Sequence, residues 1–186
     1  MYKAFRLLAI LLVVLATGCA ERVEETDTGG VLLEVQFDNS QFRVGVNDGD
    51  LVSLDTVTIS SIVPNDEQPS SQLQDVQLDT VELTYSRADS GTTVPPALVY
   101  NLVGIGPVGG ELTYSNLPIM SIDQLNRPPL SDLLFENGAV DRETGLDHIR
   151  LNVTIRVFGR TVAGTEVAST PRSQTFEFVP TLTNIF

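Results

Sequence analysis

Two segments of the chain alternate apolar and polar residues with a period of two. In residues 31–37 the positions on one side are all apolar, namely Val31, Leu33, Val35 and Phe37. Residues 148–158 repeat the pattern with apolar positions at Ile149, Leu151, Val153, Ile155 and Val157. Side chains of a β-strand point alternately to opposite faces, so each pattern is typical of a strand with one buried face. We predict that both segments are strands whose apolar positions face a core.

Turn-forming residues divide the remaining chain into further short apolar segments. They predict strands at 42–46, 51–63, 76–86, 97–103, 110–115 and 165–179, separated by breakers such as NDGD (47–50), GPVGG (106–110) and STPRS (169–173). Residues 121–137 differ, because Ser121 and Gln124 have the spacing of a capping box and two prolines and a glycine flank a short apolar stretch. One or two short helical turns are expected there.

About seven strands without a strand–helix–strand rhythm predict an all-β fold with two packed sheets. The closing segment, IRLNVTIRVFGRTVAGTEVASTPRSQTFEF, resembles the last hairpin of immunoglobulin-like and fibronectin type III-like domains. In those domains a strand ends at a glycine, a short loop carries a second glycine, and a long last strand returns; Gly159 and Gly164 match these two positions. The resemblance implies a single immunoglobulin-like antiparallel β-sandwich. The disulfide and tryptophan of antibody domains are absent, which leaves the strand topology open.

The first 18 residues have the layout of a secretory signal peptide. Lys3 and Arg6 precede the apolar run from 7 to 15, and small residues at 16–18 lead to Cys19, the one cysteine of the chain. The apolar run has the length of a signal peptide and is shorter than a membrane span. A single cysteine makes no intrachain disulfide, and with one histidine in the chain it does not complete a zinc site.

The segment Leu-Ala-Thr-Gly-Cys at 15–19 resembles a bacterial lipobox. This resemblance implies that Cys19 is diacylated on sulfur, becomes the mature N-terminus and anchors the chain in a lipid bilayer. The aliphatic residue usual three places before the cysteine lies four places before it here, with Ala16 in its place. Ala20 follows the cysteine, which resembles the outer-membrane sorting pattern of Gram-negative bacteria. An ordinary cleaved signal or a chance cysteine is the alternative.

These features divide the chain into four parts. We predict a signal peptide at 1–18, the acylated cysteine with a flexible acidic linker at 19–30, the β-sandwich at 31–180 and a C-terminal tail at 181–186. The linker carries charges, threonines and a Gly-Gly pair without apolar periodicity, so its root-mean-square span is about 15–20 Å. The expected location is the extracytoplasmic side of the cell envelope.

The net charge of the chain limits the classes of partner that it can bind. The net charge is -13, and removal of residues 1–18 makes it more negative, because Lys3 and Arg6 are lost without any acid. An acidic surface repels phosphate backbones and anionic headgroups, so we expect no nucleic-acid binding and a domain that stands off the bilayer. The excess of acids fits simple solubility and is also compatible with a cationic partner.

Residues 47–55 contain the side chains most suited to a metal. Asn47, Asp48, Asp50 and Asp55 offer oxygen ligands of the kind calcium accepts, but their spacing differs from the EF-hand loop. Turn formation accounts for the same residues, so they are weak calcium candidates and no metal site is predicted.

No other motif predicts a cofactor or a reaction. Gly104, Gly106 and Gly109 fit G-x-G-x-x-G, but Pro107 and a strand-like continuation replace the helix that a dinucleotide needs, which indicates a glycine-rich hairpin. His148 follows Asp147, and no serine lies in a G-x-S-x-G elbow, so no catalytic triad is predicted.

The sequence therefore favours a lipid-anchored, non-catalytic structural or protein-binding module of the envelope. A carbohydrate- or calcium-binding surface lipoprotein is the alternative, in which Tyr85, Tyr100 and Tyr114 would have to supply the aromatic shelf for a sugar. An envelope hydrolase is the third hypothesis, and carboxylates would have to be its general acids and bases.

Overall fold

The computed structural model describes residues 30–38, 42–49, 51–63 and 71–182. Outside these residues lie the predicted signal peptide, the predicted lipidation site Cys19, most of the predicted linker, and Asp50. The strands are β1 (Leu32–Asp38), β2 (Arg43–Gly45), β3 (Ser53–Ile62), β4 (Val76–Arg87), β5 (Leu98–Gly106), β6 (Glu111–Pro118), β7 (Ile149–Thr161), β8 (Glu166–Ala168) and β9 (Arg172–Val179). The helical turns are η1 (Gln72–Gln74), α2 (Ile122–Leu125), η2 (Leu130–Leu133) and η3 (Phe135–Asn137).

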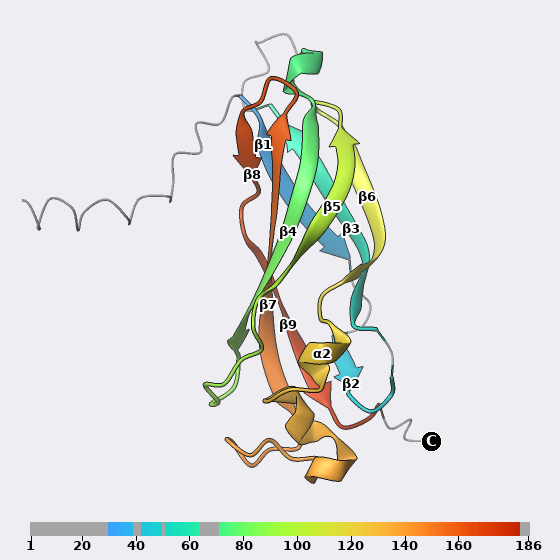
Figure 1. Ribbon diagram of the computed structural model, residues 1–186, viewed down its shortest axis with the longest axis vertical. Coiled ribbons are helices and arrows are strands. Elements are labelled where there is room, and N and C mark those ends of the chain that lie inside the picture. The colour runs from blue at the N-terminus through green and yellow to red at the C-terminus, as the bar shows by residue number, and fades with distance from the viewer. Residues whose placement is uncertain (1–29, 39–41, 50, 64–70, 183–186) are drawn as a thin grey trace, which may run out of the picture.

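The strands form two sheets that pack face to face (Figure 1). One sheet has the order β1-β3-β6, and the other has the order β2-β9-β7-β4-β5 with β8 also paired to β7. Neighbouring strands are antiparallel except β2 and β9, which run parallel. Of the seven long strands, the first, second and fifth lie in one sheet, and the third, fourth, sixth and last lie in the other, with the fourth at the edge beside the third. This is an immunoglobulin-like arrangement. The predicted all-β sandwich is confirmed.

The core lies between the sheets, at the positions that the alternation predicts. In β7 the five inward side chains are at most 1% exposed; they are Ile149, Leu151, Val153, Ile155 and Val157. Val31, which directly precedes β1, is buried, as are Leu33 and Val35 within the strand, and Phe37 is half-buried. Burial of these aliphatic faces supplies the main driving force for packing one sheet on the other.

Two details of the predicted strands are wrong. The glycine-rich segment at 104–110 does not join a hairpin, because β5 pairs with β4 and β6 pairs with β3, so the turn carries the chain from one sheet to the other. Gly159 does not end its strand but lies within β7, where a Cβ would come 2.5 Å from the Gln77 carbonyl oxygen. That close approach accompanies the register shift in β4 between Leu78 and Thr80.

The predicted strand at 165–179 is divided into two strands at its breaker residues. β8 ends at Ala168 and β9 begins at Arg172, on either side of Pro171, which has no N–H for a ladder. Between them Ser169 continues the pairing with β7, because its N–H donates to the Val157 carbonyl (2.8 Å) and its Oγ accepts from the Val157 N–H (2.9 Å).

The sandwich has two distinct ends. Gly30 enters at one end, where an added Cβ would lie 3.3 Å from Gln74 Nε2. We call the three turns there, residues 71–75, 107–110 and 161–165, the entry pole. The opposite end carries residues 88–97 and 119–148, which we call the far pole (Figure 1). The helical turns predicted within 121–137 are confirmed at the far pole, whereas η1 at the entry pole was not predicted.

Candidate functional site

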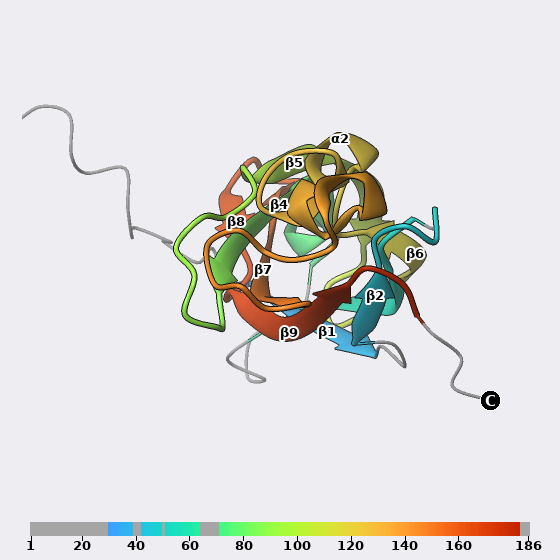
Figure 2. The same cartoon turned by 90° about the horizontal axis from the view of Figure 1, so that it is seen from below.

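The far pole is built from two connections between strands. Residues 88–97 link β4 to β5, and residues 119–148 link β6 to β7 with three short helical turns. Viewed along the long axis, the second connection covers the end of the sandwich (Figure 2). Connections that lack a ladder need other partners for their polar groups, and here buried side chains supply them.

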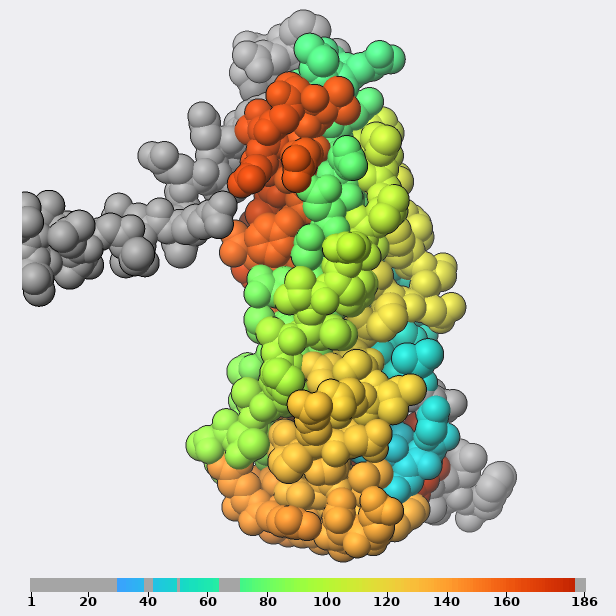
Figure 3. Space-filling model, in the orientation of Figure 1, coloured from blue at the N-terminus to red at the C-terminus, as the bar shows by residue number. Residues whose placement is uncertain are grey.

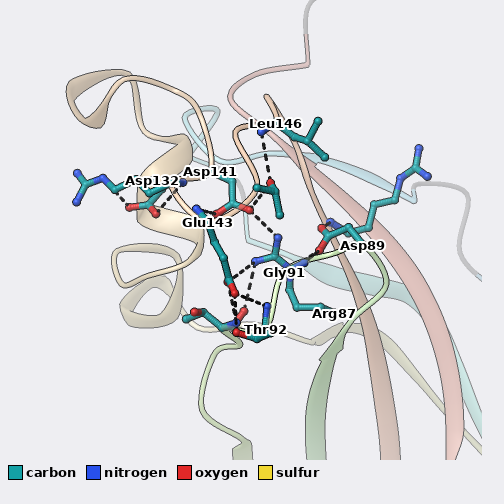
Figure 4. A network of polar contacts seen from close by, with 12 residues as sticks. Arg87, Asp89, Gly91, Thr92, Asp132, Asp141, Glu143 and Leu146 are labelled. Atoms are coloured by element: carbon teal, nitrogen blue, oxygen red, sulfur yellow. Dashed lines mark hydrogen bonds and ion pairs between the residues drawn. The ribbon is translucent and has the colours of Figure 1, made fainter.

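Arg87, the last residue of β4, is the centre of these contacts (Figure 4). Its side chain is only 3% exposed. Its Nε lies 2.6 Å from Asp89 Oδ1, and its Nη2 lies 2.6 Å from Asp141 Oδ2. Its Nη1 lies 3.4 Å from the Thr93 carbonyl oxygen and 3.9 Å from Glu143 Oε2. One cation therefore ties both connections to the sheet.

The two aspartates that flank Arg87 accept further hydrogen bonds. Asp89 accepts from the N–H groups of Gly91 (2.9 Å) and Arg150 (2.8 Å). Asp141 accepts from the Thr144 hydroxyl (2.6 Å) and from the Glu143 N–H (3.2 Å). Each buried carboxylate thus has several donors, as a charge held out of water requires.

Glu143 joins the two connections from the outer side. Its Oε1 accepts from the N–H (2.7 Å) and the hydroxyl (2.5 Å) of Thr92, and its Oε2 accepts from the Thr93 N–H (2.9 Å). The carboxylate therefore closes residues 88–97 against residues 138–148, as the dashed lines in Figure 4 show.

These contacts lower the pKa of all three acids. Burial alone would raise the pKa of Asp89 and of Asp141, but the hydrogen bonds and the charge of Arg87 outweigh burial and lower both values. Hydrogen bonds from the Thr92 side chain and from the N–H groups of Thr93 and Thr92 lower the pKa of Glu143 to about 2. For Arg87, burial would lower the pKa, but Asp89 and Asp141 raise it. All four groups are charged near neutral pH.

A pocket of about 240 Å³ opens beside this network. It is lined by Thr93, Pro128, Pro129, Asp132, Asp141, Arg142 and Glu143. Asp132 is nearly buried, and its Oδ1 lies 3.4 Å from Nε of Arg142, whose side chain is 69% exposed. Of the acids that line the pocket, Asp141 and Glu143 have a lowered pKa, so both are charged hydrogen-bond acceptors near neutral pH.

The capping box at Ser121 fixes the start of the far-pole connection. The Ser121 N–H donates to Gln124 Oε1 (2.8 Å), and the Gln124 N–H donates to Ser121 Oγ (3.2 Å). The buried amide of Gln124 also donates to the Pro96 carbonyl (2.6 Å) and to the Tyr85 hydroxyl (3.4 Å). A short local motif is thereby locked to the second connection and to β4.

The calcium candidates hold segments of the chain together. The amide of Asn47 donates to the carbonyls of Leu133 (3.2 Å) and Pro180 (2.7 Å). The carboxylate of Asp48 accepts from the Thr181 hydroxyl (2.5 Å) and from the Leu182 N–H (3.0 Å).

The other two weak calcium candidates are Asp55 and Asp50. Asp55 is exposed on β3 and lines a pocket of about 80 Å³ together with Asp48, and Asp50 lies outside the described residues. Within the part of the chain that the structure describes, no three acidic, histidine or cysteine side chains converge in a metal-binding arrangement.

The three tyrosines bridge the two sheets. The hydroxyls of Tyr85, Tyr100 and Tyr114 donate to the carbonyls of Ile119 (2.7 Å), Pro118 (2.9 Å) and Val103 (3.1 Å). Burial raises the pKa of Tyr85 and of Tyr100 to about 12 and raises that of Tyr114 as well. These phenols remain donors at any physiological pH, and they hold the side of the sandwich where β5 and β6 are edge strands.

The remaining predicted features lie apart from the far-pole network. His148 Nδ1 lies 3.0 Å from Asp147 Oδ1, and the Asp147 side chain is 85% exposed. Gly104, Gly106 and Gly109 lie in β5 and in the turn toward β6, and strand β6 follows them rather than a helix.

Sequence reasoning did not find Arg87. A signal was present, because Val81, Leu83 and Tyr85 face the core and the same alternation places Arg87 inward. An inward arginine requires carboxylates close by. Nothing local shows that Asp141 and Glu143, more than fifty residues away, supply them.

Comparison with known proteins adds no family. No protein-family model matches this chain, and no curated protein is significantly similar to it. Within the described residues, none of the helices has the length and apolar character needed to traverse a bilayer.

Proposed function

We propose that this protein is a lipid-anchored, non-catalytic module of the cell envelope that binds another protein through its far pole. Acylated Cys19 would hold it in the bilayer, on the extracytoplasmic side and at the outer membrane if the source is Gram-negative. The lipobox-like segment at 15–19 and the acidic linker support the anchor.

The observation that carries this proposal is the position of the far pole. Gly30 lies beside Gln74 at the entry pole, whereas Arg87 lies at the other end of β4. A chain held at its N-terminal end therefore presents the far pole away from the membrane, toward whatever it meets. The buried ion pairs of Arg87 fix the shape of that surface before binding, which lowers the ordering cost of association.

The surface of the far pole has the composition of a binding site. Ile122 (63% exposed), Phe135 (62%) and Val140 (40%) are apolar side chains in contact with solvent. Charged residues lie among them, including Asp123, Arg127 and Arg142, whose side chains are all more than 60% exposed. Apolar anchors within a polar rim are the usual anatomy of a protein interface.

The anchor is tested by fractionation and mass spectrometry. We expect the native protein to begin with an acylated cysteine and Cys19→Ser to release it from membranes. An intact Met1 or a free thiol at Cys19 would contradict the anchor.

The binding surface is tested by site-specific photocrosslinking in native membranes. A photoreactive residue at position 135 should capture one reproducible protein. The same residue at Val99, which is 57% exposed on β5, is the matched control and should not. Equal capture from both positions would overturn the proposal. So would the absence of capture from position 135 together with a hydrolase activity that the substitution of one carboxylate abolishes.

A further inference from the structure

The three turns of the entry pole carry almost no charge. Among residues 71–75, 107–110 and 161–165 the only charged residue is Asp75. Its carboxylate accepts a hydrogen bond from the Val108 N–H (2.9 Å) and is thus turned toward the neighbouring turn. The low charge is confined to the turns themselves, because the exposed acids Glu111 and Glu166 directly follow two of them. Residues 119–148 of the far pole differ, with eight charged residues, namely Asp123, Arg127, Asp132, Glu136, Asp141, Arg142, Glu143 and Asp147.

Two aliphatic side chains project from these turns. Leu73 is 59% exposed and Val162 is 56% exposed. Their turns are joined, because the Val162 N–H donates to the Asp75 carbonyl (2.8 Å) and the Ala163 N–H donates to the Leu73 carbonyl (3.0 Å). Figure 3 shows the two segments together at one end of the molecule. Three further apolar side chains, each at least 39% exposed, lie at the strand ends nearest the entry pole. They are Leu32 in β1, Ile62 in β3 and Ile105 in β5.

The length of the chain before Gly30 determines which pole meets the membrane. The eleven residues from 20 to 30 span about 15–20 Å on average. The thirteen residues of β7 extend over about 43 Å, at about 3.3 Å per residue. A tether attached at the entry pole is therefore shorter than the sandwich, so it keeps the entry pole near the bilayer and the far pole away from it.

We propose that the entry pole rests on the bilayer that holds the Cys19 anchor, with Leu73 and Val162 in the headgroup region. This inference rests on the proposed anchor. It departs from the expectation that the acidic domain stands off the membrane, because contact would be made through turns whose one charged residue is Asp75. A lipid surface fits these turns since uncharged, partly apolar turns lose little when phosphocholine headgroups replace water. Contact at this pole would also orient the far pole outward.

The chain allows a direct test, because it has no tryptophan and one cysteine. The chain from Cys19 to Phe186, which contains every described element, is coupled through its thiol to a maleimide lipid. It is then bound to phosphatidylcholine vesicles with and without brominated acyl chains. We expect the brominated lipid to quench the emission of a Leu73→Trp variant. An Ile122→Trp variant is the matched control, 63% exposed at the far pole, and should keep its emission.

The chemical anchor separates this test from the test of native acylation. If Cys19 is not acylated in the cell, the proposed function fails, yet the quenching result still decides whether the entry pole contacts lipid. Val162→Trp gives the same measurement from the neighbouring turn if Leu73→Trp does not fold. Equal quenching at 73 and 122, or no quenching at 73 and 162, would overturn the inference. So would a concentration-dependent emission shift without vesicles, which would assign the surface to a second copy of the chain.

Discussion

The same four-residue motif begins a helical turn at each pole of the molecule. Ser71-Gln-Leu-Gln74 opens η1 at the entry pole, and Ser121-Ile-Asp-Gln124 opens α2 at the far pole. Both form a capping box with reciprocal hydrogen bonds between the serine and the glutamine. The local chemistry of the two turns is therefore alike.

The surroundings of the two glutamines differ. Gln124 is 4% exposed and donates to the Pro96 carbonyl and the Tyr85 hydroxyl, whereas no residue of η1 is buried. A local motif thus determines that a turn forms, and contacts distant in sequence determine how much that turn contributes to stability. The poles as a whole show the same contrast, since buried ion pairs hold the far pole and backbone hydrogen bonds such as Val162 N–H to Asp75 join the turns of the entry pole.

The largest effect is expected from Arg87→Met at the far pole. The change leaves Asp89 and Asp141, both nearly buried, without their cation. Removing one partner of a buried ion pair costs about 3–5 kcal/mol, because the remaining charge stays out of water. Urea unfolding at neutral pH measures the loss of unfolding free energy.

Arg127→Met is the control for this change at the same pole. Arg127 pairs with Asp123 at 2.9 Å, but both side chains are more than 60% exposed, so the cost should stay below about 0.5 kcal/mol. Similar losses for the two variants would show that the Arg87 network contributes no more than a surface pair.

The strands were predictable because their signal is local. In β7 alternation alone placed Ile149, Leu151, Val153, Ile155 and Val157 inward, and the capping box at 121 marked a helical turn. Local sequence did not show which sheet each strand joins. β5 and β6 are joined by a short glycine-rich turn that suits a hairpin, and their separation into two sheets depends on pairing with β4 and β3.

The far-pole network was predictable only in part. The alternation of β4 places Arg87 inward, which shows that carboxylates must lie nearby, but their identity depends on how residues 119–148 fold back over the end of the sandwich. Grouping in sequence was equally uninformative at 47–55, where Asn47, Asp48, Asp50 and Asp55 were weak calcium candidates that turn formation also explained. Asn47 and Asp48 instead form hydrogen bonds to Leu133 and to residues 180–182.

The second-largest loss of stability is expected from Gln124→Ala. The substitution removes the glutamine half of the capping box, which accepts from the Ser121 N–H, and leaves the Pro96 carbonyl and the Tyr85 hydroxyl without this donor. Loss of buried hydrogen bonds of this kind costs about 1–3 kcal/mol. Gln74→Ala is the matched change at the entry pole and should cost about 0.5 kcal/mol, near the lower limit for a cap. Chemical unfolding measures the loss of unfolding free energy in both variants. Equal losses would contradict the prediction that the packed turn depends more on its glutamine.

Acid should open the far pole before the entry pole. The folded-state pKa values of Asp89, Asp141 and Glu143 are lowered, with Glu143 at about 2 instead of 4.5. The unfolded chain therefore binds more protons than the folded chain as pH falls below about 4.5, so the stability these groups contribute is present above that pH and is lost toward pH 2.

Amide hydrogen exchange measures this loss at each pole separately. The Thr92 and Thr93 amides, which donate to Glu143, should lose protection between about pH 4.5 and about pH 2, while the Val162 and Ala163 amides should keep theirs. Comparison with the intrinsic exchange rate at each pH removes the direct effect of acid. Simultaneous loss at both poles would indicate global unfolding and would contradict a separate far-pole response.

The smallest effect is expected from Ser71→Ala at the entry pole. Ser71 is exposed, and its turn remains attached through the backbone hydrogen bonds from Val162 and Ala163, so the change should cost no more than about 0.5 kcal/mol. Ser121→Ala removes the same cap from a turn that orients the buried Gln124 amide, and about 1 kcal/mol is expected. A thermal or urea unfolding series on the two single variants and the double variant measures both costs. The two sites lie at opposite poles and share no partner, so the costs should add. A larger loss at Ser71 than at Ser121 would mean that the exposed turn, rather than the packed one, depends more on its cap.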